Sequence, residues 1–65
     1  MPQEILESFN TGRTLIWNDP DPIEGNDYTI RKLWDVTEDT ACIQYGPDSS
    51  ALSEAEVFIE EIEIL

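Results

Sequence analysis

Apolar residues along the chain change from a helical to a strand-like spacing. In residues 2–9 they recur at helical spacing, which predicts one or two helical turns that pack on a core. Gly12 follows as a natural helix terminator. Residues 13–17 are β-branched and aromatic and predict a strand. Because side chains alternate along a strand, Leu15 and Trp17 are expected to share one face.

Turn-forming residues divide the middle of the chain. The stretch 18–27 contains two prolines, a glycine and four acids, which predicts a long surface loop. Residues 28–36 and 41–45 predict two strands joined by a short polar turn, and a second turn follows the latter strand. Leu33 and Trp34 are adjacent apolar residues, which indicates a bulge or a strand bend between them.

The last segment, residues 53–65, fits two interpretations. Ser53 with Glu56 three residues later fits a capping box, and the apolar residues that follow fall near one helical face. That pattern favours an α+β fold, in which a C-terminal helix packs on a three-stranded antiparallel sheet. The stretches 56–59 and 61–64 read equally well as strands, the second with strict alternation. Propensity alone favours the helix.

Two short motifs bear on this choice. The sequence Trp-Asn-Asp-Pro-Asp at residues 17–21 is followed by Tyr-Thr-Ile, and Ser-Glu-Ala-Glu-Val-Phe at residues 53–58 is followed by Glu-Ile. This motif pair resembles a group of small bacterial proteins, associated with gut bacteria and their mobile elements, that have no assigned reaction. The resemblance spans about residues 14–64 and implies no activity. The first dozen residues depart from the pattern.

The resemblance implies a mainly β fold, namely a small SH3-like five-stranded barrel. The length of 65 residues leaves room for one domain, over residues 1–65. A short N-terminal helical turn would precede the barrel. The C-terminal segment would then form a strand over residues 54–58, a 3-10 turn over 59–61 and a last strand over 62–65. Such a barrel hides its sheet edges, and we prefer it to the helical alternative.

The net charge of the chain limits the classes of partner that we expect it to bind. The chain has fifteen Asp and Glu, three Lys and Arg and no histidine, giving a net charge of -12. Nucleic acids and anionic lipids require basic residues, so we expect neither direct nucleic-acid binding nor membrane binding. No apolar run approaches the roughly 20 residues of a membrane span, and the N-terminus does not resemble a signal peptide. The single Cys42 can close no intrachain disulfide, which favours a reduced, cytoplasmic location.

The sequence gives little support for an enzyme active site or a metal-binding site. Without histidine or a nucleophile paired with a base, we expect no enzyme and no cofactor. Cys42 is better explained as inert packing in its strand. Four acids of the 18–27 loop resemble calcium ligands at first sight: Asp19, Asp21, Glu24 and Asp27. The two prolines stiffen that loop and Gly25 lies at the wrong offset, so a solvated turn is favoured and no metal is expected.

The leading hypothesis is a non-enzymatic acidic module that binds a basic peptide or a cationic protein surface. An exposed aromatic beside the acidic loop would attract a cation by cation–π and Coulomb forces. The residues expected to carry this binding are Trp17, Asp19, Asp21, Tyr28 and Trp34. The simpler alternative places Trp17 and Tyr28 in the core.

A second hypothesis is a phage or mobile-element inhibitor that imitates nucleic acid. Alternate carboxylates on a strand lie about 6.6 Å apart, a spacing comparable to that of backbone phosphates. The expected acidic face comprises Glu54, Glu56, Glu60, Glu61 and Glu63. A solvated surface that only keeps the protein soluble is the simpler explanation. A structural accessory subunit is a third possibility.

Overall fold

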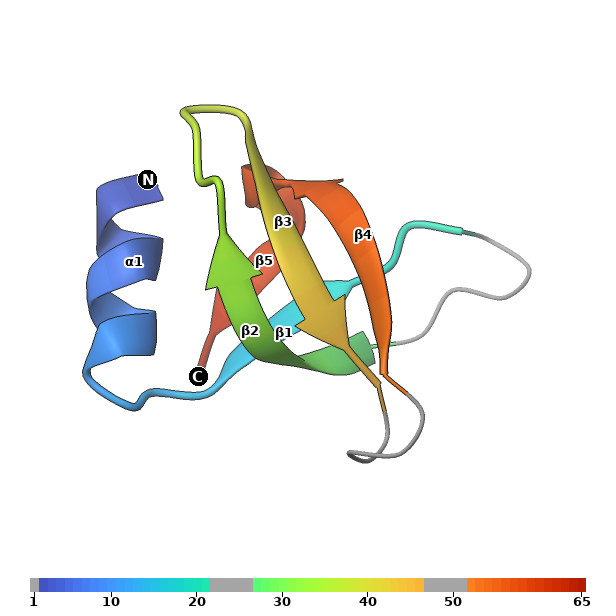
Figure 1. Cartoon of the computed structure of the whole chain (residues 1–65), viewed down its shortest axis with the longest axis horizontal. Helices are drawn as coiled ribbons and strands as arrows, with labels where there is room; N and C mark the ends of the chain where they lie inside the picture. Colours follow the sequence, from blue (N-terminus) through green and yellow to red (C-terminus); the bar gives the residue numbers. More distant parts are fainter. Residues whose placement is uncertain (1, 22–26, 47–51) are drawn as a thin grey trace.

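The fold is mainly β, in a computed structural model that describes residues 2–21, 27–46 and 52–65. The elements are α1 (Pro2–Asn10), β1 (Leu15–Asn18), β2 (Asp27–Trp34), β3 (Thr40–Tyr45), β4 (Ser53–Phe58), the 3-10 turn η1 (Ile59–Glu61) and β5 (Ile62–Ile64). Figure 1 shows α1 to one side of the sheet, joined to it by the short segment that leads into β1.

The N-terminal helix is confirmed, and it ends where the sequence predicts. Gly12 has a φ of +87°, in the left-handed region that glycine adopts without a steric penalty. This conformation lets the Arg13 N–H donate to the Ser8 carbonyl oxygen at 3.0 Å, which caps the last turn. Ile5 and Ser8 are the buried residues of α1. The helix therefore covers the core with one face.

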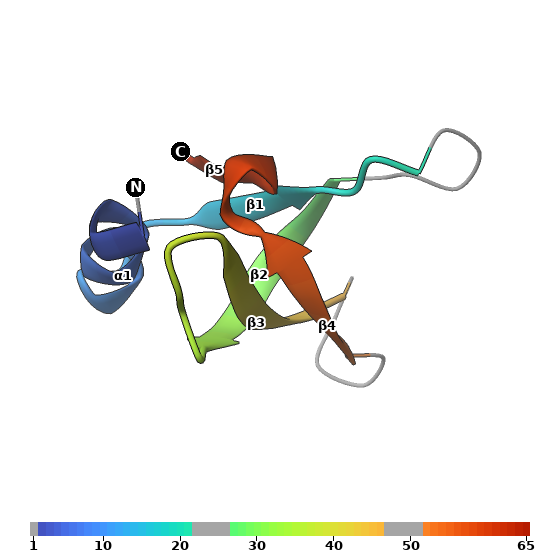
Figure 2. The same ribbon diagram turned by 90° about the horizontal axis from the view of Figure 1, so that it is seen from above.

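The five strands form one antiparallel sheet in the order β4-β3-β2-β1-β5. The beginning of β2 pairs with β1, and its later part pairs with β3. Figure 2 shows β2 running from one half of the sheet to the other. The sheet is unclosed, and its strand order and 3-10 turn are compatible with an SH3-like barrel.

The irregularity in β2 lies at a different place from the predicted one. The pairing register shifts between Ile30 and Lys32, whereas Leu33 and Trp34 pair regularly with β3. Ile30 and Leu33 are an odd number of residues apart, so an extra residue between them is required if both are to face the core. Trp34 points away from the core and is 36% exposed. The predicted position was wrong because it rested on the adjacency of Leu33 and Trp34, of which only Leu33 packs against the core.

The C-terminal segment forms a strand, a 3-10 turn and a strand, so the helical α+β alternative is wrong. Val57 and Ile59 are buried and Ala55 is half-buried, whereas the alternating residues Glu56 and Phe58 are exposed. This period of two is that of a strand with one face on the core. The local capping-box pattern is overridden because a helix would not keep these three apolar residues on the sheet.

Among the described residues, Ser8 is the one polar residue buried with the apolar core. Its buried hydrophobic residues are Ile5, Leu15, Trp17, Ile30, Ala41, Ile43, Val57 and Ile59. Leu15 and Trp17 share the inward face of β1, as predicted. Leu15 and Ile43 are the largest side chains that are fully enclosed. The strands β1 to β4 each contribute to this cluster, and the partly buried Ile62 and Ile64 of β5 pack against it. The outward-facing residues are therefore left to carry the charge.

Candidate functional site

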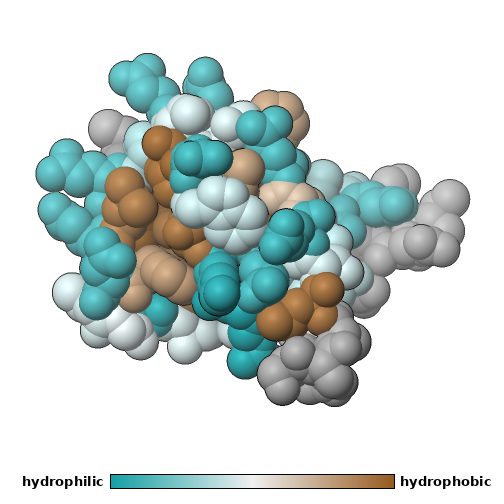
Figure 3. All heavy atoms as spheres, viewed as in Figure 1, coloured by the Kyte–Doolittle hydropathy of each residue, from teal (hydrophilic) through white to brown (hydrophobic). Residues whose placement is uncertain are grey.

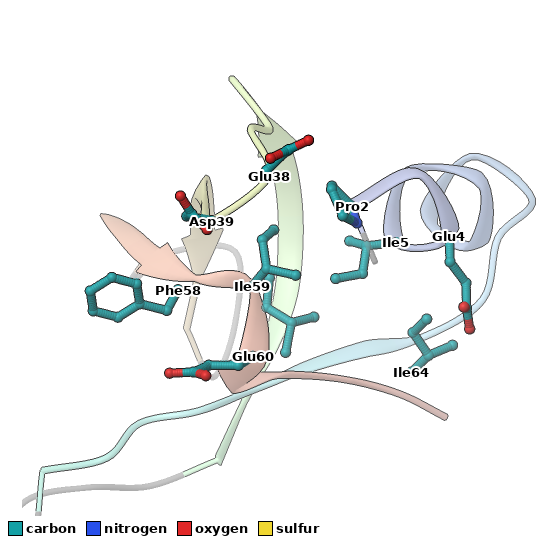
Figure 4. Close-up of a pocket in the computed structure, with 10 residues that line it drawn as sticks. Pro2, Glu4, Ile5, Glu38, Asp39, Phe58, Ile59, Glu60 and Ile64 are labelled. Carbon is teal, nitrogen blue, oxygen red and sulfur yellow. The ribbon is translucent and has the colours of Figure 1, made fainter.

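A pocket of about 770 Å³ lies between α1, the β2–β3 connection and the segment from β4 to β5. Its apolar lining comes from Pro2 and Ile5 in α1, Phe58 at the end of β4, Ile59 in η1, and Ile62 and Ile64 in β5. Ile5 and Ile59 point toward each other across it (Figure 4). Figure 3 shows apolar side chains gathered between α1 and the sheet, surrounded by hydrophilic ones. The pocket can therefore accept an aliphatic or aromatic side chain.

The rim of the pocket is acidic. Glu4, Glu38, Asp39 and Glu60 line it, and all four are exposed. Figure 4 shows Glu38 and Asp39 on one side of the pocket and Glu60 on another. No lysine or arginine is among the described lining residues. Carboxylates that face one opening without a cation create a negative potential there. The rim therefore favours a positively charged ligand.

Hydrogen bonds hold the two acids of the β2–β3 connection above the pocket. The Thr37 hydroxyl oxygen accepts from the N–H groups of Asp39, at 3.2 Å, and Thr40, at 3.0 Å. The Thr37 N–H donates to the Thr40 carbonyl oxygen at 2.8 Å. The Ile59 N–H donates to the Asp39 carbonyl oxygen, also at 2.8 Å. The Thr37 hydroxyl thus closes the turn, and the backbone hydrogen bond from Ile59 ties the acidic connection to the pocket floor.

The structure brings Trp17 and Tyr28 together, but it places the indole in the core. They are cross-strand partners, with ring centroids 5.8 Å apart. Tyr45 meets Trp17 edge-on at 4.9 Å and Tyr28 at 4.8 Å. The Trp17 Nε1–H donates to the Glu61 Oε1 at 3.1 Å. Because Trp17 is only 8% exposed, its ring offers little surface to a cation.

The predicted loop acids follow directly after β1. The Asp19 Oδ1 accepts from the Asp21 N–H at 3.1 Å, the hydrogen bond of a local turn. Of the other residues considered as calcium ligands, Asp27 begins β2, and Glu24 lies outside the described residues. Within the described ranges, no group of three or more His, Cys, Asp or Glu side chains is placed to hold a metal ion.

Trp34 lies apart from the other predicted aromatic residues. It ends β2, six residues after Tyr28, a separation of about 20 Å along a strand. It pairs with Cys42 on β3, which pairs in turn with Glu56 on β4. This row on the outer face of the sheet contains Trp34, which the basic-peptide hypothesis names, and Glu56, which the nucleic-acid-mimic hypothesis names. Sequence reasoning assigned them to separate surfaces because it had no strand register.

The carboxylates around this row affect the cysteine. Cys42 is half-buried in β3, with its side chain on the face opposite to the core. Desolvation raises the pKa of its thiol, and the negative charges of Asp35, Glu56 and Glu54 raise it further. The reactive thiolate is disfavoured, so the site does not activate Cys42 as a nucleophile.

The five acids of the nucleic-acid-mimic hypothesis are distributed over three elements. Glu54 and Glu56 are exposed on β4, Glu60 lines the pocket from η1, and Glu63 is exposed on β5. Glu61 is half-buried and accepts the indole hydrogen bond described above. The structure therefore divides them among the outer sheet face, the pocket rim, the Trp17 contact and β5.

In comparisons with known proteins, no family model matches the chain, and no curated protein or solved structure matches it significantly. The resemblance to small bacterial proteins stays a prediction. Among the described residues, no helix has the length and apolar character needed to span a bilayer.

Sequence reasoning missed the pocket itself. Its lining combines residues from α1, Glu38 and Asp39, and residues after Val57. The alternation Glu-Ile-Glu-Ile at residues 61–64 was a usable signal, because it gives the last strand an apolar face. The sequence did not reveal that α1 stands opposite that face.

Proposed function

We propose that the protein is a non-enzymatic binding module that accepts a basic peptide or a cationic protein surface at the pocket beside α1. The observation that supports this proposal is the combination of an isoleucine floor with four exposed carboxylates on the rim. A suitable partner segment presents an apolar side chain flanked by lysine or arginine. The apolar side chain enters the pocket, and the flanking cations meet the rim.

The two parts of the site contribute differently to binding. Burying one leucine-sized side chain contributes about 1.5–3 kcal/mol, whereas an exposed ion pair contributes about 0.2–1 kcal/mol. The pocket floor therefore provides most of the affinity. The rim carboxylates attract the partner and accelerate association. Because they are exposed, salt screens them, with a Debye length of about 8 Å at 0.15 M ionic strength.

The experiment uses a fluorescent peptide in which one leucine is flanked by lysines. The rim variant Glu38→Lys with Asp39→Lys changes the net charge from -12 to -8, since each reversal adds two charges. We expect slower association, at least about tenfold, and a weaker salt dependence. The control variant Glu7→Lys with Glu63→Lys has the same net charge but changes exposed acids outside the pocket lining.

Equal losses in the two variants would show that only the net charge matters, and the pocket proposal would be abandoned. A second comparison tests the floor. Replacing the leucine of the peptide by serine should accelerate dissociation while leaving the association rate nearly unchanged, because the anchor acts after the encounter. An unchanged dissociation rate would rule out an anchored side chain.

A further inference from the structure

The strand β4 lies at one edge of the sheet (Figure 1). Within the described part of the chain, it pairs with β3 and with no other strand. An edge strand presents N–H and C=O groups that can pair with another chain. β4 is six residues long and contains no proline or glycine, so it is long and regular enough to act as a template.

The register shows which backbone groups face outward. Thr40 is opposite Phe58, and Asp39 follows opposite Ile59, whose N–H donates to the Asp39 carbonyl oxygen. Thr40 directs its own N–H and C=O to Thr37. The pair 39–59 is therefore hydrogen-bonded and the pair 40–58 is not. Such pairs alternate along an antiparallel ladder. The residues whose backbone groups point away from β3 are then Glu54, Glu56 and Phe58.

The same three residues also carry the outward side chains. Glu54, Glu56 and Phe58 are exposed, whereas Val57 is buried and Ala55 half-buried. An antiparallel strand added at this edge would form hydrogen-bonded pairs with Glu54 and Glu56. At Phe58 it would receive only the N–H, because the Phe58 carbonyl lies at the N-cap of η1 and accepts within that turn. The side chains of the added strand opposite these three residues would lie on the outer face, at Cα separations of about 5.5 Å. The edge therefore presents two carboxylates and one phenyl ring in a fixed order.

We infer that the β4 edge binds an extended basic segment of a partner protein as an additional strand. In the antiparallel orientation, the segment has the pattern apolar–x–basic–x–basic. Its apolar residue lies opposite Phe58, and its lysine or arginine residues lie opposite Glu56 and Glu54. Opposite charges in such cross-strand positions stabilise the pairing. Backbone hydrogen bonds provide the register, and the carboxylates select the sequence.

Charge argues against a second copy of this chain as the occupant. Two β4 edges paired antiparallel about Ala55 would place Glu54 of one copy opposite Glu56 of the other. Like charges directly opposite each other destabilise a strand pair. Each copy also carries a net charge of -12. The acids that oppose self-association are the ones that favour a basic strand.

This inference shares with the proposed function the cationic class of partner and the residue Phe58, which also lines the pocket, whereas Glu54 and Glu56 belong to the edge alone. The test uses the full ¹⁵N-labelled chain and a synthetic peptide of the sequence Leu-Thr-Lys-Thr-Lys with capped ends. We expect the amide signals of Glu54 and Glu56, which do not line the pocket, to shift and their hydrogen exchange to slow. Shifts confined to Ile62, Ile64 and the rim acids would overturn the edge inference and leave the pocket proposal standing.

Backbone methylation of the peptide separates strand addition from charge attraction. Methylating the nitrogen of the first lysine, opposite Glu56, removes one hydrogen bond to β4 and should weaken binding about threefold to tenfold. Methylating the following threonine is the matched control, because its N–H points away from β4. Equal affinities for the two peptides would refute the inference. Concentration-dependent dimerisation of the free protein through β4 would also refute it.

A protein variant provides a second test. Glu56→Gln removes one charge from an exposed side chain, so the fold is retained. We expect it to weaken peptide binding about twofold to fivefold. Glu63→Gln on β5 makes the same change of charge away from this edge and should have a smaller effect. An equal effect in both variants would mean that the edge does not select the cation.

Discussion

Replacing Trp17 by phenylalanine tests whether this indole holds the fold together. Trp17 lies in the core, packs against Tyr28 and Tyr45, and donates its Nε1–H to Glu61. The hydrogen bond joins β1 to η1, the turn that leads into β5. Phenylalanine keeps an aromatic ring at this position but removes the donor and part of the buried volume. The substitution therefore affects the packing at the end of the sheet.

The expected loss of stability follows from these contacts. The hydrogen bond from a buried indole to a half-buried carboxylate contributes about 1–2 kcal/mol. The smaller ring leaves unfilled space beside the tyrosines, at a cost of about 1–2 kcal/mol. The sum of about 2–4 kcal/mol is a large share of the total for a domain of this size, which is roughly 3–10 kcal/mol at about 0.05–0.15 kcal/mol per residue.

The assay is urea unfolding followed by circular dichroism, for Trp17→Phe, Glu61→Ala and the double variant. We expect the two substitutions to be coupled by about 1 kcal/mol, because they remove the same hydrogen bond. Glu63→Ala removes the same charge without an indole partner, so it controls for relief of repulsion among the acids. Additive effects, with a coupling below about 0.3 kcal/mol, would refute the hydrogen bond as a stabilising contact.

Two further predictions concern Cys42 and Gly12. Because the pKa of Cys42 is raised, alkylation by iodoacetamide should accelerate only at a higher pH than for an ordinary thiol. Glu56→Gln should move this dependence of the alkylation rate on pH to lower pH, whereas the control Glu63→Gln should leave it in place. Protonation of the thiol favours the folded state. Its contribution to the free energy of unfolding is therefore complete below the unfolded-state pKa and is lost as pH rises through the folded-state pKa. In urea unfolding, Cys42→Ala should lack this loss of stability at alkaline pH. Gly12→Ala should lower the free energy of unfolding by about 1 kcal/mol. The loss comes from the positive φ alone, since an added Cβ would meet no atom within 4 Å. An unchanged thermal midpoint would contradict this account.

Local patterns were sufficient for most elements of the fold. The helix before Gly12 and the strands over residues 15–18 and 40–45 follow from short-range periodicity and turn residues. The last segment could not be decided in this way, because the capping box at Ser53 and the alternation near its end are both local signals. Tertiary packing resolves the conflict, since only a strand places Val57 with its neighbours on the core.

The candidate site depended on information that the sequence does not express locally. The pocket requires Ile5 to lie near Ile59, and the two are separated by most of the chain. The row that joins Trp34 to Glu56 requires the pairing register of three strands. Residue type identified Trp17 as important, but only its burial and its hydrogen bond to Glu61 indicate a structural role.

If the protein binds cationic ligands as proposed, the separation between its apolar core and its anionic exterior determines which of them remain bound. The pocket-rim carboxylates are exposed and keep their water, so they cost little to maintain and each contributes little affinity. A simple polycation such as polylysine would therefore associate quickly and also dissociate quickly. Long residence requires buried apolar area or ordered backbone hydrogen bonds. The isoleucine pocket offers the first and the β4 edge the second, so we expect a partner of the proposed cationic class to combine positive charge with an apolar anchor or an extended backbone.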